Sequence, residues 1–430
     1  MTDRKQHLPI SDIPYLKEPK VECITLDNGI KVLMLNSGDE GVTRITFSWQ
    51  GGQYESTAPA ASYLLTKLLK DSNPDLSANG MADLLDSCGA WVTSELKSHY
   101  MALSLFTINS QLHNVLPAII DTINRPVFPE AETELLKTQS ASRFELISKK
   151  VTFLAQELEN GRIFGKGHPA SLTPRPDDYL KVSVSDLQMQ YATMYQGQAP
   201  VVYIAGKIDE SVRALILCEL SRINTVNELT TPLDLRPFSP GKPGIERIDK
   251  PDSLQSALLI TMPAIPRKHP DYEKLRAVVI ALGGYFGSRL MTTIREEKGL
   301  TYGISAALLG HREGSFITIS SQCDNSYTEL VIREVLNEIH RLATEPMTQS
   351  ELTTLKRYIR SILAATFDTP FSAMDYFTAH RHIGTPLDYL HRQQYALEQL
   401  TPETIMQLAS EYLDKPAKYI SVAGKITSKK

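Results

Sequence analysis

The sequence predicts an α+β protein made of two pseudo-symmetric domains, each a mixed or antiparallel sheet with packed helices. Runs such as VECITLDNGIKVLML and TRITFSW alternate apolar and polar residues, which is typical of strands. Runs such as APAASYLLTKLLKD and DYEKLRAVVIALGG repeat apolar residues at helical spacing. Strands interspersed with helices, with hairpin-like neighbouring strands, favour α+β over a doubly wound parallel sheet.

A repeat between the two halves of the chain predicts that the two domains are homologous. Pairs of similar segments occur in the same order in each half, with little drift in their offset. The pairs are ETELLKTQ (132–139) with SELTTLKR (350–357), PDDYL (176–180) with PLDYL (386–390), SDLQMQYATMY (185–195) with PETIMQLASEY (402–412), and VVYIAGKI (201–208) with YISVAGKI (419–426). This order indicates a duplicated domain.

The predicted boundary between the domains is a segment near the midpoint of the chain. PLDLRPFSPGKPG, from Pro232 to Gly244, is rich in proline and glycine and suits neither a helix interior nor a central strand. We therefore predict a first domain over residues 1–228, a linker over 229–245 and a second domain over 246–430.

Composition and charge argue against several classes of function. The net charge of −4 provides no basic field for binding nucleic acid or an anionic membrane. No window approaches the roughly eighteen apolar residues of a membrane span. The four cysteines are scattered without a CxxC pair, which predicts reduced thiols, no disulfide framework and no cysteine-based zinc site. The opening MTDRKQHLPI lacks an apolar signal region and predicts a cytoplasmic protein as written, or a periplasmic one if a signal has been removed.

Residues 283–305, GGYFGSRLMTTIREEKGLTYGIS, predict a helix, a turn and a strand. Phe286, Leu290 and Ile294 recur every four residues and predict one apolar helical face. Gly299 can adopt the left-handed conformation that closes a helix. The helix is therefore expected to end just before this glycine.

An arginine and a tyrosine flank this turn. Leu300, Tyr302 and Ile304 alternate as in a strand, and Arg295 lies in the last turn of the helix. Arg295 and Tyr302 are therefore predicted to project beside the turn, toward one cavity. Taken singly, the arginine is explained as a cation at a helix C-terminus and the tyrosine as a strand residue on a sheet surface.

These residues resemble the second domain of the M16 (pitrilysin, or mitochondrial processing peptidase-like) metallopeptidase family. The runs G-S-R-L and R-E-x-x-G-L-x-Y are similar to the family's signature around its Arg/Tyr substrate-binding pair. In the first half, LDNGIKVLML (26–35) is similar to the family's opening strand, and GGQYE (51–55) resembles the positions that precede its zinc helix. The resemblance covers nearly the whole chain and implies the LuxS/MPP-like metallohydrolase fold.

The zinc motif of the family's catalytic members is missing from the corresponding helix. That motif, H-x-x-E-H, carries two histidine ligands and a glutamate that activates water. Aligned on the shared apolar spacing, the slot falls on Ser62 to Thr66 within PAASYLLTKLL (59–69), and it holds no histidine or glutamate. We therefore predict no zinc and no catalytic residue in this chain.

The histidines elsewhere do not replace this motif. No two are four apart with a glutamate between them. His380 and His382 are two residues apart, so on a helix they face different sides, and we interpret them as surface side chains. Glu145 lies near the place of the family's third zinc ligand, and we interpret it as a solvated helical residue.

The resemblance implies a function shared between two chains. In two-chain relatives one subunit carries zinc and its partner carries the Arg/Tyr pair. Arg295 and Tyr302 are thus expected to bind an unfolded peptide and to serve the zinc site of a partner M16 subunit that bears H-x-x-E-H. On its own the chain is expected to be inactive, as part of a heterodimeric zinc metalloendopeptidase.

Two alternatives stay open at this point. One is a zinc-free homodimer that binds peptides in a chaperone-like way, and self-association is also expected when the partner is absent. The other is a structural core protein like the peptidase-derived core proteins of respiratory complexes. ALGGYFGSRL is too short for the long glycine-rich loop of the mitochondrial non-catalytic subunit, which argues against presequence recognition.

Overall fold

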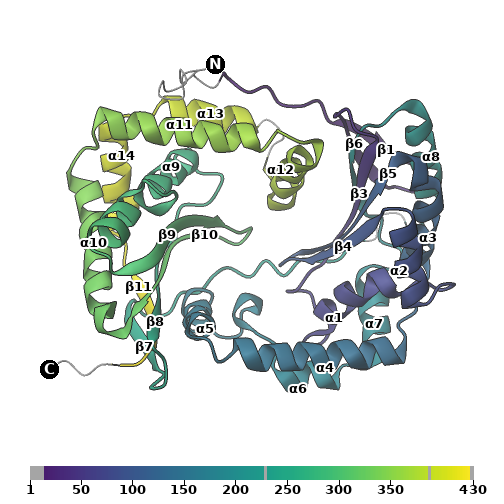
Figure 1. Cartoon of the computed structure of the whole chain (residues 1–430), viewed down its shortest axis with the longest axis horizontal. Coiled ribbons are helices and arrows are strands. Elements are labelled where there is room, and N and C mark those ends of the chain that lie inside the picture. The colour runs from purple at the N-terminus through teal and green to yellow at the C-terminus, as the bar shows by residue number, and fades with distance from the viewer. Residues whose placement is uncertain (1–13, 227–229, 386–388, 427–430) are drawn as a thin grey trace, which may run out of the picture. The chain divides into compact units, whose positions relative to one another are not determined.

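The computed structural model describes residues 14–226, 230–385 and 389–426, and Figure 1 labels the elements of this part of the chain. By their contacts the described residues fall into two compact units. The larger unit comprises residues 19–259, 369–384 and 419–426, and the smaller unit comprises residues 14–18, 260–368 and 385–418, with the gaps given above. The N-terminal stretch that underlies the compartment prediction and the start of the PLDYL repeat lie outside the described residues.

The larger unit contains a mixed sheet, here called the first sheet. Its strands in spatial order are β1 (Glu22–Thr25), β2 (Lys31–Asn36), β6 (Val201–Gly206), β3 (Val42–Gln50), β5 (Tyr100–Ile108) and β4 (Trp91–Leu96). β2 and β6 run parallel, and the other neighbouring pairs are antiparallel. The predicted strand runs therefore form β1, β2 and β3.

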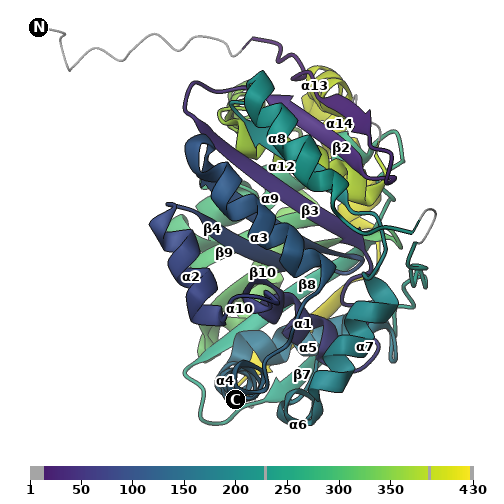
Figure 2. The same cartoon turned by 90° about the vertical axis from the view of Figure 1, so that its right-hand side faces the viewer.

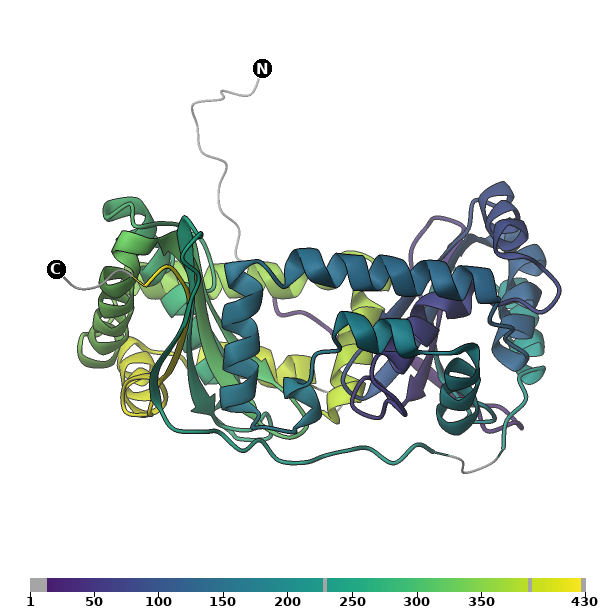
Figure 3. The ribbon, with the colours of Figure 1, turned by 90° about the horizontal axis from the view of Figure 1, so that it is seen from below.

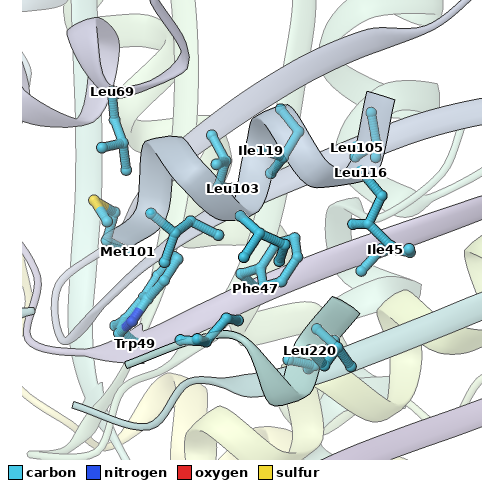
Figure 4. Packing of buried hydrophobic residues seen from close by; sticks show 14 of the residues in the cluster. Ile45, Phe47, Trp49, Leu69, Met101, Leu103, Leu105, Leu116, Ile119 and Leu220 are labelled. Atoms are coloured by element: carbon cyan, nitrogen blue, oxygen red, sulfur yellow. The ribbon is translucent and has the colours of Figure 1, made fainter. Parts of the chain in front are cut away.

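The central strand β3 is buried along almost its whole length and separates two kinds of packing. Ile45, Phe47 and Trp49 point into the hydrophobic core. Figure 4 shows this cluster packing against Leu116 and Ile119 on a neighbouring helix. Each such fully buried apolar side chain contributes about 1.5–3 kcal/mol of transfer free energy, so this face holds the sheet and its helices together.

Helices of the same unit supply the rest of this core. They are α1 (Ala61–Leu68), α2 (Ala78–Ser87), α3 (Leu112–Asn124), α7 (Val184–Met194) and α8 (Glu210–Ser221). Figure 2 shows α3 and α8 lying across the strands of the first sheet. α1 forms where the sequence predicts a helix, because its apolar residues recur every three or four positions.

The residues of β3 that alternate with these core residues point to the opposite face of the sheet. There Arg44 contacts a helix from the second half of the sequence, α12 (Pro370–Ile383). The Arg44 guanidinium donates to both carboxylate oxygens of Asp375 at 2.6 and 3.0 Å, and to the carbonyl of Phe371 at 3.0 Å. It also lies 5.6 Å from the ring centroid of Phe371 and 5.7 Å from that of Phe106. The buried arginine therefore ties α12 to the first sheet.

The second half of the sequence provides the strands of a second sheet. In spatial order they are β7 (Gly244–Asp249), β11 (Tyr419–Gly424), β8 (Gln255–Ala264), β10 (Ser315–Asp324) and β9 (Thr301–Gly310). β7 and β11 are parallel, and β9 and β10 are antiparallel. Residues 230–243 contain neither helix nor strand, and β7 begins at Gly244.

A helix of the first half packs on this second sheet. α4 (Glu130–Ile147) leads into α5 (Val151–Ile163), both blue in Figure 3. Ala155 of α5 packs against Ala257, Leu259 and Ala423. α5 on β11 thus mirrors α12 on the first sheet, so each half of the sequence contributes a helix to the sheet of the other half. The repeated segments at 132–139 and 350–357 lie in the helix that precedes each of these two exchanged helices.

The remaining helices complete both units. They are α6 (Pro176–Lys181), α9 (Tyr272–Gly283), α10 (Thr328–Thr344), α11 (Gln349–Ala365), α13 (Tyr389–Glu398) and α14 (Pro402–Ala409). The predicted α+β class is confirmed, whereas the domain limits at 228 and 246 stay a prediction. Within the described ranges, no helix is both long enough and apolar enough to cross a membrane.

Candidate functional site

The segment before Arg295 differs from the predicted continuous helix. α9 ends at Gly283, helical residues resume at Arg289, and a π-helical stretch follows from Met291 to Glu297. Leu290 and Ile294 are fully buried as expected, but Phe286 lies in the intervening turn and is 62% exposed. The prediction that Phe286 belongs to the buried helical face was wrong, because glycine-rich residues 283–287 break the helical periodicity.

Tyr302 also departs from the predicted pattern. Thr301 pairs with Cys323 and Ile304 with Ser321, so β9 has one more residue than β10 between these two pairs. Such a β-bulge shifts the alternation of side chains and commonly re-aims one of them. Tyr302 is 92% exposed while Ile304 is only 4% exposed. The prediction that these two share one face was wrong, and the bulge turns the tyrosine outward.

Arg295 and Tyr302 do meet at the turn, through the backbone. Gly299 has a φ of 62°, which confirms the predicted left-handed helix end. The Arg295 Nε donates to the carbonyl oxygen of Tyr302 at 3.0 Å, and the guanidinium carbon lies 4.9 Å from the ring centroid of Phe286. One edge and one face of the guanidinium are thereby held, which orients its Nη groups. Sequence reasoning missed this role of Phe286.

The slot of the missing zinc motif is a buried part of α1 with no metal-binding chemistry. Ser62 and Thr66 are each 1% exposed, and Leu65 is fully buried. The Ser62 hydroxyl donates to the carbonyl of Gly52 at 3.3 Å, and the Thr66 hydroxyl donates to the carbonyl of Ser62 at 2.7 Å. Zinc is held by thiolate, imidazole or carboxylate ligands, so these residues do not fit it.

Buried Glu55, just before α1, pairs with buried His99 in the turn between β4 and β5, and sequence reasoning missed this pairing. The Glu55 Oε1 is 2.7 Å from the His99 Nδ1, and its Oε2 accepts from the Gly52 N–H at 2.8 Å. The Asp234 N–H also donates to Oε1 at 3.1 Å. The two side chains are used in holding the 51–55 turn, and no local signal in the sequence links positions 44 residues apart. Among the described residues, no group of three or more His, Cys, Asp and Glu side chains is placed to hold a metal ion.

The other titratable residues singled out from the sequence lie apart from this slot. His380 is 7% exposed, and His382 stacks on Tyr100 with ring centroids 3.6 Å apart. The interpretation of both histidines as surface side chains was therefore wrong, because α12 is packed against the first sheet. Glu145 is exposed on α4, as expected.

A cavity of about 590 Å³ opens in the larger unit beside the slot. Ser62 and Thr66 contribute to its lining, together with Ala60, Tyr63 and Tyr179. Ala60 has a φ of 65°, a conformation that is uncommon outside glycine. Sequence reasoning did not find this cavity, because its walls come from segments more than a hundred residues apart.

The sequence is similar to a known peptidase family and to several of its relatives. Residues 181–359 match the family described as the peptidase M16 inactive domain. The non-peptidase homolog YmxG of Helicobacter pylori is 21% identical over 359 residues, covering 81% of this chain and 81% of that protein. The chain therefore resembles the M16 family over residues 181–359, and the likeness to relatives of that family extends over most of the chain. An uncharacterized zinc protease of Mycobacterium leprae is also 21% identical, over 87% of this chain and 84% of its own length.

Solved structures share the fold of this chain. The crystal structure of a peptidase M16 inactive domain from Pseudomonas fluorescens superposes with a TM-score of 0.85. The two sequences are 21% identical, and the match covers 95% of this chain and 99% of that one. The unsuitable residues of the slot agree with the likeness to a protein named a non-peptidase homolog.

A half-buried tyrosine, Tyr179, and a buried one, Tyr203, predict a distinctive alkaline titration of the larger unit. Burial, together with Tyr63 and Asp178 nearby, raises the pKa of Tyr179 to about 12, and burial also raises the pKa of Tyr203 to about 12. Because the unfolded chain ionises near the ordinary value of 10.0, the contribution of these tyrosines to stability is complete below that pH. This stabilising contribution is expected to be lost as the pH rises from about 10 through about 12.

The raised pKa values are measured by the phenolate absorbance of the folded protein at increasing pH. A late titration step near pH 12 is expected, and Tyr179→Phe should reduce its amplitude. Titration of every tyrosine near pH 10 in the folded protein would contradict the prediction.

Proposed function

We propose that this chain is the non-catalytic, substrate-binding subunit of a heterodimeric zinc peptidase. The observation that carries the proposal is the orientation of Arg295 by the Tyr302 carbonyl and the Phe286 ring, beside an outward-facing Tyr302. A chain that served only as a scaffold would have no need of this arrangement. The slot at Ser62 to Thr66 lacks zinc ligands, so the metal has to come from another chain.

In the proposed complex each chain supplies different groups for peptide hydrolysis. The partner M16 subunit bears H-x-x-E-H and supplies zinc and the general base. Arg295 donates hydrogen bonds to the backbone carbonyls of an unfolded peptide, and the Tyr302 hydroxyl donates to an oxygen that gains negative charge. These groups raise the rate by positioning the peptide and by stabilising charge, and they transfer no proton themselves.

A second candidate is a zinc-free homodimer that binds peptides or serves as a structural core. The cavity beside α1 favours it, because this half of the chain keeps space for a ligand without a metal. In both proposals the homologous domains span residues 1–228 and 246–430, and the chain acts in the cytoplasm, or in the periplasm if a signal peptide has been removed.

Purification of the tagged chain from its native cells separates the two candidates. We expect a partner of similar length bearing H-x-x-E-H in equal amounts, identified by mass spectrometry, and peptide hydrolysis only when both chains are present. Recovery of the chain with itself alone, at its natural abundance, would contradict the heterodimer and support the homodimer. A mixture reconstituted from the two purified chains provides the control for loss during extraction.

A further inference from the structure

We propose that the cavity beside α1 is a binding site for an aromatic ring that carries a carboxylate. The cavity has a volume of about 590 Å³, within the range of sites that hold small molecules or short peptide ends. All of its lining belongs to the larger unit. The inference is independent of a catalytic partner, because it concerns a site contained in this chain.

The walls of the cavity suit a flat apolar group. Tyr63 of α1 and Tyr179 of α6 meet edge to face, with ring centroids 5.7 Å apart. Pro59 and Leu172 add further apolar surface, and Leu172 is exposed at 59%. Aromatic rings pack favourably on such edges and faces. A ring entering the cavity would therefore cover apolar surface that now faces solvent.

Ser62 and Thr66, which line one side of the cavity, offer no hydrogen-bond donor to a ligand. The hydroxyl protons of Ser62 and Thr66 are already donated to backbone carbonyls. Neither side chain is thus free to donate to a ligand, and neither can hold a metal there. What remains at this side is a small, closely packed surface against which a ring can lie.

The lining of the cavity includes two cationic side chains, Lys67 and Arg236, that could donate to a ligand. Lys67 follows Tyr63 by one helical turn, is exposed, and makes no ion pair within the described part of the chain. Arg236, the other cation of the lining, is already bound through Nε to both carboxylate oxygens of Asp234, at 2.9 and 3.0 Å. The Lys67 ammonium is therefore the group that selects an anionic ligand.

The lining also includes a carboxylate, which limits where the anion can lie. The Oδ2 of Asp178 accepts from the Arg175 N–H at 2.8 Å, at the start of α6. Tyr179 follows it and keeps its proton at neutral pH, since its pKa is raised to about 12 by burial and by its neighbours. The ligand carboxylate is thus expected at Lys67, with the ring packed against the contacting pair Tyr63 and Tyr179.

Calorimetric titration of the full chain tests the proposal with N-acetylphenylalanine and its amide. The acid is expected to bind about tenfold more tightly than the amide, as a charge-assisted contact with an ammonium would give. Lys67→Met should abolish this preference, whereas Lys31→Met, at an exposed position of β2, should preserve it. Ala58→Trp, which adds a ring to the lining, should remove binding of both probes, with circular dichroism confirming the fold.

The ligand could be either the C-terminus of a peptide or a free aromatic acid. A second pair of probes, Gly-Gly-Phe and Gly-Gly-Phe amide, distinguishes these two cases. Tighter binding of the tripeptide acid than of N-acetylphenylalanine identifies a peptide C-terminus as the ligand, and weaker binding identifies a free aromatic acid. Absence of binding by both acids to the wild-type chain, or equal binding of acid and amide, would overturn the proposal. Neither outcome bears on the role of Arg295 and Tyr302, which lie in the smaller unit.

Discussion

Joint replacement of Arg295 by lysine and Tyr302 by phenylalanine is expected to lower kcat/KM of the assembled peptidase about 100- to 1,000-fold, the usual cost of removing donors that stabilise developing charge. Lysine keeps the positive charge but loses the Nε that donates to the Tyr302 carbonyl and the planar group that stacks on Phe286. Phenylalanine keeps the exposed ring and loses its hydroxyl. Hydrolysis of an unfolded peptide by the complex measures the effect.

The control distinguishes lost chemistry from lost assembly. Arg392→Lys with Tyr395→Phe changes an exposed arginine and tyrosine on α13 and is expected to leave hydrolysis unchanged. Both double variants should elute with the partner subunit in the same proportion as the wild-type chain. If the complex carrying Arg295→Lys and Tyr302→Phe hydrolyses peptides at the wild-type rate, the proposed role of the pair is wrong.

Replacement of Arg162 by methionine is expected to reduce the free energy of unfolding by about 2–4 kcal/mol, because each buried carbonyl that loses its donor costs about 1–3 kcal/mol. The Arg162 side chain is 7% exposed, and it enters the second sheet from α5. It donates to the carbonyls of Ile420 at 2.8 Å and Gly244 at 2.7 Å, and its Nε is 3.1 Å from Glu246. Methionine fills much of the volume but leaves these carbonyls without their donor.

Urea unfolding followed by circular dichroism measures this loss, with the slope of the transition compared as well as its midpoint. The matched control is Arg175→Met, because Arg175 is 53% exposed in its ion pair with Glu157. An exposed pair of this kind contributes only about 0–1 kcal/mol. Equal effects of the two substitutions would show that Arg162 does not anchor α5 to the second sheet.

Arg44 has a comparable position on the other exchanged helix. It fixes α12 to the first sheet through Asp375 and Phe371, as Arg162 fixes α5 to β11 and β7. The repeat predicts that equivalent helices occur in both halves. It carries no information about which sheet each helix covers, because an apolar helical face is complementary to any apolar surface of suitable shape.

Local features were predicted from short stretches of sequence. β2, β3 and α1 have clear periodicities, and Gly299 ends its helix in the left-handed conformation because no side chain opposes it. The absence of zinc ligands at Ser62 to Thr66 was also readable directly, since the chemistry of a ligand is a property of the residue itself. These inferences need no knowledge of distant partners.

Arg295 and Tyr302 were found through their resemblance to a family signature, but their geometry was not predictable. The β-bulge depends on how β9 pairs with β10, and the exposure of Phe286 depends on where α9 stops. Periodicity reports which side of an element is apolar, and it assumes that the element is regular. Both errors arose where that regularity fails, next to the candidate site.

The residues alone determined the α+β class and the absence of zinc ligands at Ser62 to Thr66, because these follow from local periodicity and side-chain chemistry. The duplication of the domains stays a prediction from internal similarity. Only the tertiary structure decided the pairing of Glu55 with His99, the exchange of α5 and α12, and the cavity lined by Tyr63 and Tyr179. Each of these joins segments far apart in the chain. Such contacts are selected by the free energy of the whole packed state, to which every segment contributes.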